Sequence, residues 1–130
     1  SRNDNTIVYS ADLEKVFKWV ENNTSQNEII LTDERNGNLI PAYTGRRVLY
    51  GHPFETVNSD RMKHIVQEFF AADTDPSRKL DIINNWHVDY ILIESDMNQI
   101  RDIGQLSRIQ LHFELDQYSV FEVIDSGASD

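Results

Sequence analysis

Chemically versatile side chains gather in residues 37–56, between two strongly patterned parts of the sequence. The segment holds the adjacent arginines Arg46 and Arg47 and the histidine His52 among turn-forming residues. A guanidinium can bind a phosphate or a sugar acid through two parallel hydrogen bonds, and a histidine can exchange a proton near neutral pH. The alternative roles are a salt bridge to nearby acidic residues for the arginines and a position in a turn for His52.

Carboxylates follow two apolar runs that we predict to be strands, at residues 28–32 and 88–93. If these strands and a third at residues 47–50 run parallel, their carboxyl ends form one cleft, where ligands collect in such sheets. Helix caps or solvated strand ends are the alternative role of the same carboxylates. The candidate ligand-binding residues are Asp33, Glu34, Asn38, Tyr43, Arg46, Arg47, His52, Glu55, Glu94 and Asp96.

The elements that must position these residues are predicted from apolar spacing. Helical spacing indicates one helix capped by Ser10 that runs to about residue 20, and a second over residues 59–70. We expect a third to begin with Asp75 as its cap and Pro76 in its first turn, and a weaker helical turn over residues 97–103. Residues 36–38 are expected to be a turn, followed by a short helix over residues 39–43 in which Pro41 takes an early position and which Gly45 ends.

The C-terminal part has the alternation of a hairpin. Ile109, Leu111, Phe113 and Leu115 alternate with polar residues, which predicts a strand with one buried face, and residues 118–124 are its partner after a tight turn. Strands separated by helices predict an α/β fold, a three-layer, Rossmann-like sandwich with a mostly parallel sheet and a C-terminal antiparallel hairpin. We expect a single domain over residues 1–125 and a polar tail over residues 126–130.

Composition excludes several classes of function. The chain has 130 residues, no cysteine and a net charge of −10, so nucleic acid and anionic membrane surfaces should repel it. No apolar run is long enough to span a bilayer, and the sequence has no signal-peptide, GxGxxG, Walker A, GxSxG or HExxH pattern, so no cofactor is predicted. No metal site is predicted, because a trio of Asp33, His52 and Glu55 depends only on an assumed topology.

Several segments resemble one family of membrane proteins. They are LEKVFKWVENNT, EIILTD, GNLIPAYTGRRVLYGHPFET, a helix ending in EFF, and VDYILIES. Together they resemble the C-terminal soluble domains of bacterial polytopic membrane proteins related to GT-C, protein mannosyltransferase-like glycosyltransferases. The resemblance implies that membrane helices precede Ser1, and that the domain lies on the extracytoplasmic face of the cell membrane.

The same resemblance implies that the catalytic acid lies in an early loop of the membrane part. The fragment would then be non-catalytic, with roles in covering the active site or in contacting the acceptor or glycan. The rings of Tyr43, Tyr50 and Trp86 would suit carbohydrate or a lipid-linked sugar. The alternative is a self-contained α/β ligand-binding module or hydrolase with its cleft at the carboxyl ends of the strands.

Overall fold

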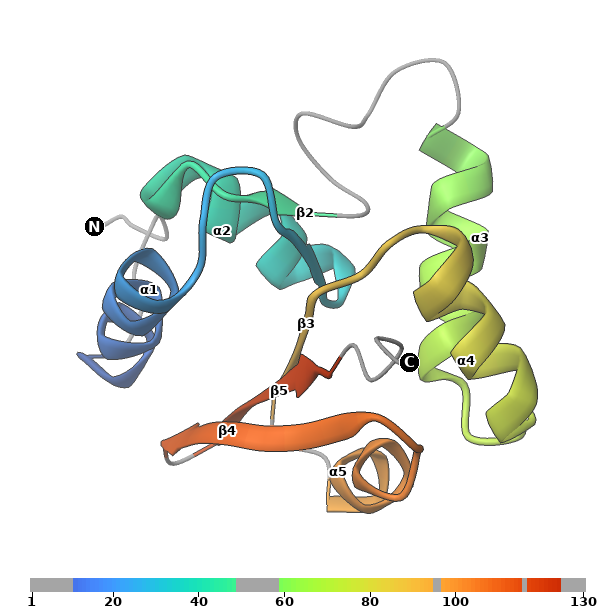
Figure 1. Cartoon of the computed structure of the whole chain (residues 1–130). Coiled ribbons are helices and arrows are strands. Elements are labelled where there is room, and N and C mark those ends of the chain that lie inside the picture. The colour runs from blue at the N-terminus through green and yellow to red at the C-terminus, as the bar shows by residue number, and fades with distance from the viewer. Residues whose placement is uncertain (1–10, 49–58, 95–96, 116, 125–130) are drawn as a thin grey trace, which may run out of the picture.

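The computed structural model describes residues 11–48, 59–94, 97–115 and 117–124. Helices and strands alternate along most of this part of the chain (Figure 1). The helices are α1 (Ala11–Asn23), α2 (Glu34–Thr44), α3 (Ser59–Phe70), α4 (Pro76–Asn85) and α5 (Met97–Gly104). The strands are β1 (Ile29–Leu31), β2 (Arg47–Val48), β3 (Tyr90–Glu94), β4 (Ile109–Leu115) and β5 (Tyr118–Val123).

The described strands form one five-stranded sheet in the order β2-β1-β3-β5-β4. β1 pairs in parallel with both β2 and β3, whereas β5 pairs antiparallel with both β3 and β4. The fold is therefore mixed α/β, and the predicted hairpin is confirmed. The prediction of a mostly parallel, Rossmann-like sheet is wrong, because β5 pairs antiparallel with both β3 and β4 and these two ladders are longer than the two parallel ladders of β1.

Two hydrophobic cores lie on opposite faces of this sheet. Alternate residues of β3 supply both cores, with Leu92 on one face and Ile91 on the other. The helices α1 and α2 cover the Leu92 face, and α3, α4 and α5 cover the Ile91 face (Figure 1). This arrangement gives the three predicted layers, and the predicted buried stripes of α1 and α3 lie in the two cores.

The helix α2 begins earlier than the sequence pattern indicated. Asp33 caps it, so Asn36 and Gly37 lie in its first turns and Pro41 lies near its end, where a turn and an early proline were expected. Turn-forming residues adopt the helix here because Asn36 and Ile40 are almost completely buried, and tertiary packing outweighs local preference. Gly45 ends the helix as predicted, with a φ of 72° that favours glycine.

The strand β4 does not have the single buried face that its alternation predicted. A bulge shifts the register between Leu111, which pairs with Phe121, and Phe113, which pairs with Val120. Phe121 and Val120 belong to opposite cores, so the bulge moves the apolar side chains of β4 from one face to the other. Leu111 is left exposed, whereas Phe113 packs against the core under α1.

The remaining predictions about organisation fall on other residues. The Ser10 cap, the second half of the strand at residues 47–50 and the tail at residues 126–130 lie outside the described residues. Asp75 and Pro76 begin α4 as predicted, although the Asp75 side chain makes no capping hydrogen bond.

Candidate functional site

Polar side chains meet where the parallel strands β1 and β3 end. The two strands are neighbours, with Leu31 opposite Ile91. The hydroxyl of Thr32 donates to the Leu92 carbonyl at 3.1 Å and continues the connection beyond the β1 ladder. The carboxyl ends of these two strands therefore lie next to each other at the same end of the sheet, as the sequence predicted.

Asp33 follows β1 at this edge and caps α2. Its carboxylate accepts a hydrogen bond from the backbone N–H of Asn36 at 2.9 Å, which satisfies one of the free donors at the start of the helix. The acid also lies at the positive end of the helix dipole. A structural role is thus sufficient to explain Asp33.

Asn36 connects this helix start to Glu94 at the end of β3. Its amide Nδ2 donates to Glu94 Oε1 at 3.1 Å, and the residue is only 1% exposed. The second carboxylate oxygen, Glu94 Oε2, accepts from Gln117 Nε2 at 3.1 Å, and this amide also lies 3.2 Å from the Tyr118 hydroxyl. The sequence-predicted Asp33 and Glu94 are therefore joined through Asn36, and we call Asp33, Asn36, Glu94 and Gln117 the strand-end cluster.

Two members of the strand-end cluster were not candidates from the sequence. Asn36 is recognisable only when α2 is known to begin after Asp33, because it then occupies the third helical position and faces inward. Its Oδ1 is buried and has no hydrogen-bond partner among the described residues, which leaves one acceptor unused in the cluster. Gln117 has no sequence signal beyond its place in the predicted turn.

Arg46 lies away from the strand-end cluster, beyond the other end of α2. Its Nη2 donates to the carbonyls of Glu21 at 2.8 Å and Thr24 at 3.1 Å. Its Nε donates to the Thr24 hydroxyl at 3.0 Å, and Nη1 to the Thr44 carbonyl at 3.2 Å. The guanidinium therefore links the C-terminal ends of α1 and α2. Basic side chains commonly bind the free carbonyls at helix C-termini in this way.

The other candidates are placed only in part. Arg47 pairs with Ile29 at the beginning of β1, so its backbone lies at the amino-terminal end of the parallel strands, opposite to the end where Asp33 lies. Its side chain and those of Glu34, Asn38 and Tyr43 are not described. The candidates His52, Glu55 and Asp96, together with Tyr50, lie outside the described residues.

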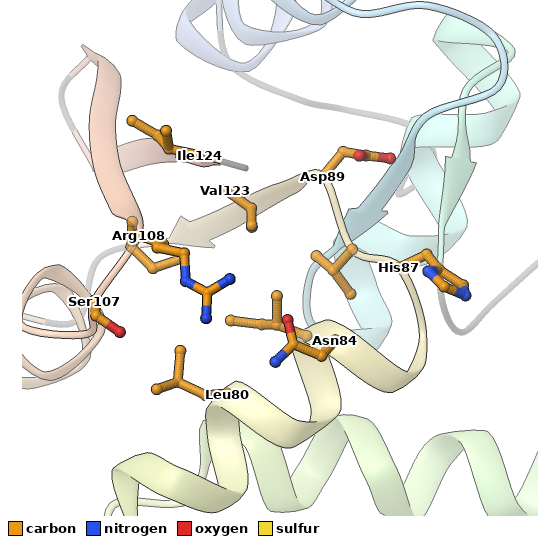
Figure 2. A pocket seen from close by; sticks show the side chains of 11 residues that line it. Leu80, Asn84, His87, Asp89, Ser107, Arg108, Val123 and Ile124 are labelled. Atoms are coloured by element: carbon orange, nitrogen blue, oxygen red, sulfur yellow. The ribbon is translucent and has the colours of Figure 1, made fainter. Parts of the chain in front are cut away.

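Three cavities lined by described residues lie elsewhere. One of about 250 Å³ lies near the start of β3 (Figure 2) and includes Asn84, His87 and Arg108 in its lining. Figure 2 shows the Arg108 guanidinium directed toward Asn84, and His87 and Arg108 have positive φ values of 55° and 63°. Asp89 also lines this cavity, but its carboxylate points away from Arg108.

The second cavity, of about 260 Å³, lies between the beginning of α4 and the end of α5 and is lined in part by Lys79 and Asp102. The third, of about 340 Å³, is a groove between α1 and β4 along Trp19 and Phe113. The rings of Trp19 and Phe113 are stacked, with centroids 5.3 Å apart. Within the described ranges, no group of three or more acidic or histidine side chains is arranged to hold a metal ion.

Comparisons with known proteins find a shared fold. No family model matches the sequence, and no curated protein matches it. Two crystal structures of the C-terminal globular domain of oligosaccharyltransferase from Archaeoglobus fulgidus are similar in fold. One, called AfAglB-S2, has a TM-score of 0.68 and 14% identity over 90% of this chain and 99% of its own. The other has a TM-score of 0.61 and 14% identity over 92% of this chain and 99% of its own.

At this low identity, the similarity establishes the fold. The shared fold is that of a globular domain found at the C-terminus of an oligosaccharyltransferase. None of the helices in the described part of the chain has the length and apolar character needed to cross a membrane.

Proposed function

We propose that this chain is a non-catalytic extracytoplasmic accessory domain of a membrane glycosyltransferase-like protein that uses lipid-linked sugars. The observation that supports this most directly is the extent of the fold similarity. About 90% of this chain matches 99% of a C-terminal globular domain of an oligosaccharyltransferase, so the likeness covers a whole domain on both sides. The partner would be the transmembrane part of the same polypeptide.

The local chemistry supports a role without catalysis. The described candidates make bonds that stabilise the fold: Asp33 caps α2, Glu94 holds Asn36 and Gln117, and Arg46 binds carbonyls at two helix ends. A catalytic acid or base needs an environment that tunes its protonation and a place for substrate beside it. None of these three side chains lines one of the three cavities described above.

The finer assignment rests on the sequence segments. The segments around residues 37–56 and 88–95 resemble bacterial relatives of protein mannosyltransferases, so we assign the parent protein to that group of GT-C enzymes. In this proposal, the domain covers the membrane active site or contacts the acceptor or glycan. The catalytic acid belongs to the membrane part.

The location can be tested through the absence of cysteine from this chain. We expect the complete reading frame to encode several hydrophobic helices before residue 1. In a full-length protein whose membrane part has been freed of cysteines, the exposed Ser77 is replaced by cysteine. A membrane-impermeant maleimide should label Ser77→Cys in cells with a permeabilised outer envelope and an intact inner membrane.

The matched control is a cysteine placed in a loop of the membrane part that faces the cytoplasm, which should react only after the inner membrane is lysed. Labelling of Ser77→Cys only after lysis would place the domain on the cytoplasmic side. That result, or a reading frame without hydrophobic helices, contradicts the proposal.

A further inference from the structure

Lys79 is an unusual residue of the helix α4. Its side chain lies on the buried face between the described helices, and the residue is only 4% exposed. Lysine is rarely so buried without a charged partner. Among the described residues, none forms an ion pair with the Lys79 ammonium or accepts a hydrogen bond from it. The Lys79 Nζ lies 5.8 Å from the centroid of the Phe69 ring.

Nearby acidic residues compensate only partly for the burial of this amino group. Burial lowers the pKa of Lys79, while the more distant charges of Asp102 and Asp73 act in the opposite direction. Neither of these acids forms an ion pair with Lys79. A charge in this position is stabilised further by any ligand that supplies an oxygen acceptor.

Lys79 lines the cavity of about 260 Å³ between α4 and α5. The cavity presents one ammonium from Lys79, one carboxylate from Asp102, and the polar side chains of Thr74 and Gln105. The Thr74 hydroxyl donates to the Glu68 carbonyl at 2.6 Å, so toward the cavity it offers lone pairs. The remaining lining is apolar and consists of Ala72, Pro76 and Leu106.

This set of groups discriminates between classes of ligand. Asp102 and Asp73 would repel an anion, and Lys79 would repel a cation. A pair of neighbouring hydroxyls suits the cavity, because one can accept from the ammonium while the other donates to the carboxylate. The apolar lining can contact the C–H groups of a ring. The volume of about 260 Å³ is slightly below the roughly 300–1,000 Å³ typical of small-molecule sites, which fits a single ring.

We propose that the cavity between α4 and α5 binds one neutral sugar ring, with Lys79 donating to one ring hydroxyl and Asp102 accepting from its neighbour. The proposal rests on the proposed function in one respect, namely that a glycan is available to this domain. It adds a site on the face of the sheet covered by α3, α4 and α5, away from the strand-end cluster.

The test is a titration of the folded, ¹⁵N-labelled chain, followed by the backbone amide signals in NMR spectra. The probes are the methyl glycosides of mannose, glucose, galactose and N-acetylglucosamine, with acetate, inorganic phosphate and methylammonium as charged controls. We expect at least one glycoside to shift the signals of Thr74, Asp102 and Gln105 in a saturable manner. The charged probes should leave these signals unchanged.

The variants are Lys79→Met and its matched control Lys63→Met, which removes an ammonium from α3 outside the cavity lining. We expect K79M to weaken glycoside binding about tenfold or more, as the loss of a charge-assisted hydrogen bond does. K63M should bind as the unmodified chain does. K79M should fold, because it replaces a buried charge with a side chain of similar shape; Asp102→Asn, at a partly exposed position, provides a second test of the same contact.

Three results would overturn the proposal. They are the absence of a glycoside response, a response equal in K79M and K63M, and a Lys79-dependent response to acetate or phosphate alone, which would define an anion site. None of these results bears on the cysteine labelling of the full-length protein. Failure of the sugar site is therefore distinguishable from failure of the proposed function.

Discussion

At the scale of single residues, Asp89 shows how a carboxylate is held between two strands. It lies immediately before β3, and its Oδ2 accepts a hydrogen bond from the Ile29 N–H at 2.9 Å. Burial has the largest effect on the pKa of Asp89 and raises it, and the hydrogen bond from Ile29 acts in the opposite direction. Between its ordinary and its raised pKa, the folded chain binds more protons than the unfolded chain. The contribution of Asp89 to the free energy of unfolding therefore falls as the pH rises through that window.

Two substitutions separate the charge of Asp89 from its hydrogen bond. Asp89→Asn keeps an acceptor for the Ile29 N–H, so we expect its free energy of unfolding to stay within about 0.5 kcal/mol of the parent chain at acid pH. At neutral pH, D89N should be at least as stable as the parent. Asp89→Ala leaves the Ile29 N–H without its partner and should cost about 1–3 kcal/mol. Urea unfolding followed by tryptophan fluorescence measures both; equal losses in D89N and D89A would show that the charge itself is stabilising.

Tyr90 has a related role next to Asp89. Its hydroxyl donates to the Asn23 carbonyl at 3.2 Å, and burial is the main cause that raises the pKa of Tyr90 to about 12. The tyrosine therefore remains neutral at physiological pH and fastens the end of α1 to β3. Together with Arg46, it holds the C-terminal end of α1 through hydrogen bonds to backbone carbonyls of Glu21, Asn23 and Thr24.

At the scale of elements, α2 depends on its cap. Asp33→Ala removes the acceptor for the Asn36 N–H and should lower the free energy of unfolding by about 1 kcal/mol. Asp33→Asn retains a side-chain oxygen and should lie within about 0.5 kcal/mol of the parent chain. Thermal unfolding monitored by circular dichroism measures the difference. If D33N loses as much stability as D33A, then the negative charge at the helix start, and not the hydrogen bond, is what matters.

The sequence predicted those elements whose local pattern agrees with their packing. The helix α3 has a continuous apolar stripe, and its predicted range, residues 59–70, is the range observed. The start of α2 was missed because Asn36 and Gly37 favour turns, and only their burial in the fold makes them helical. The bulge in β4 was missed because the alternation of residues continues through it, while His112 adds the extra position that reverses the faces. The burial of Lys79 was not predicted, because a lysine side chain usually faces solvent.

At the scale of the whole molecule, the relation between the strands decides which predicted site residues meet. Asp33 and Glu94 are brought together because each follows one of two neighbouring parallel strands. Arg46 precedes β2 and Arg47 begins it. Because β2 is parallel to β1, both arginines lie at the opposite end of the strands from Asp33 and Glu94. This difference is readable from the sequence only when the strand neighbours are known. The sheet order depends on long-range pairing that local patterns do not encode.

The antiparallel half of the sheet also depends on long-range strand pairing. Helices between strands correctly indicated parallel crossovers for β2, β1 and β3. The position of β5 between β3 and β4 is set by Phe121 and Val120, which supply the cores on the two faces of the sheet. The apolar composition of β5 is compatible with either direction, so the balance of parallel and antiparallel pairing could not be predicted.

The proposed accessory role is tested most directly by sugar transfer from a lipid-linked donor, measured with a fluorescent acceptor in reconstituted vesicles. Three samples are compared: the full-length parent protein, the parent protein lacking this domain, and this chain alone. We expect transfer by the full-length protein, reduced transfer without the domain at equal protein levels, and none by this chain alone. Transfer by this chain alone, or hydrolysis of the donor by it, would contradict the assignment of a non-catalytic accessory domain.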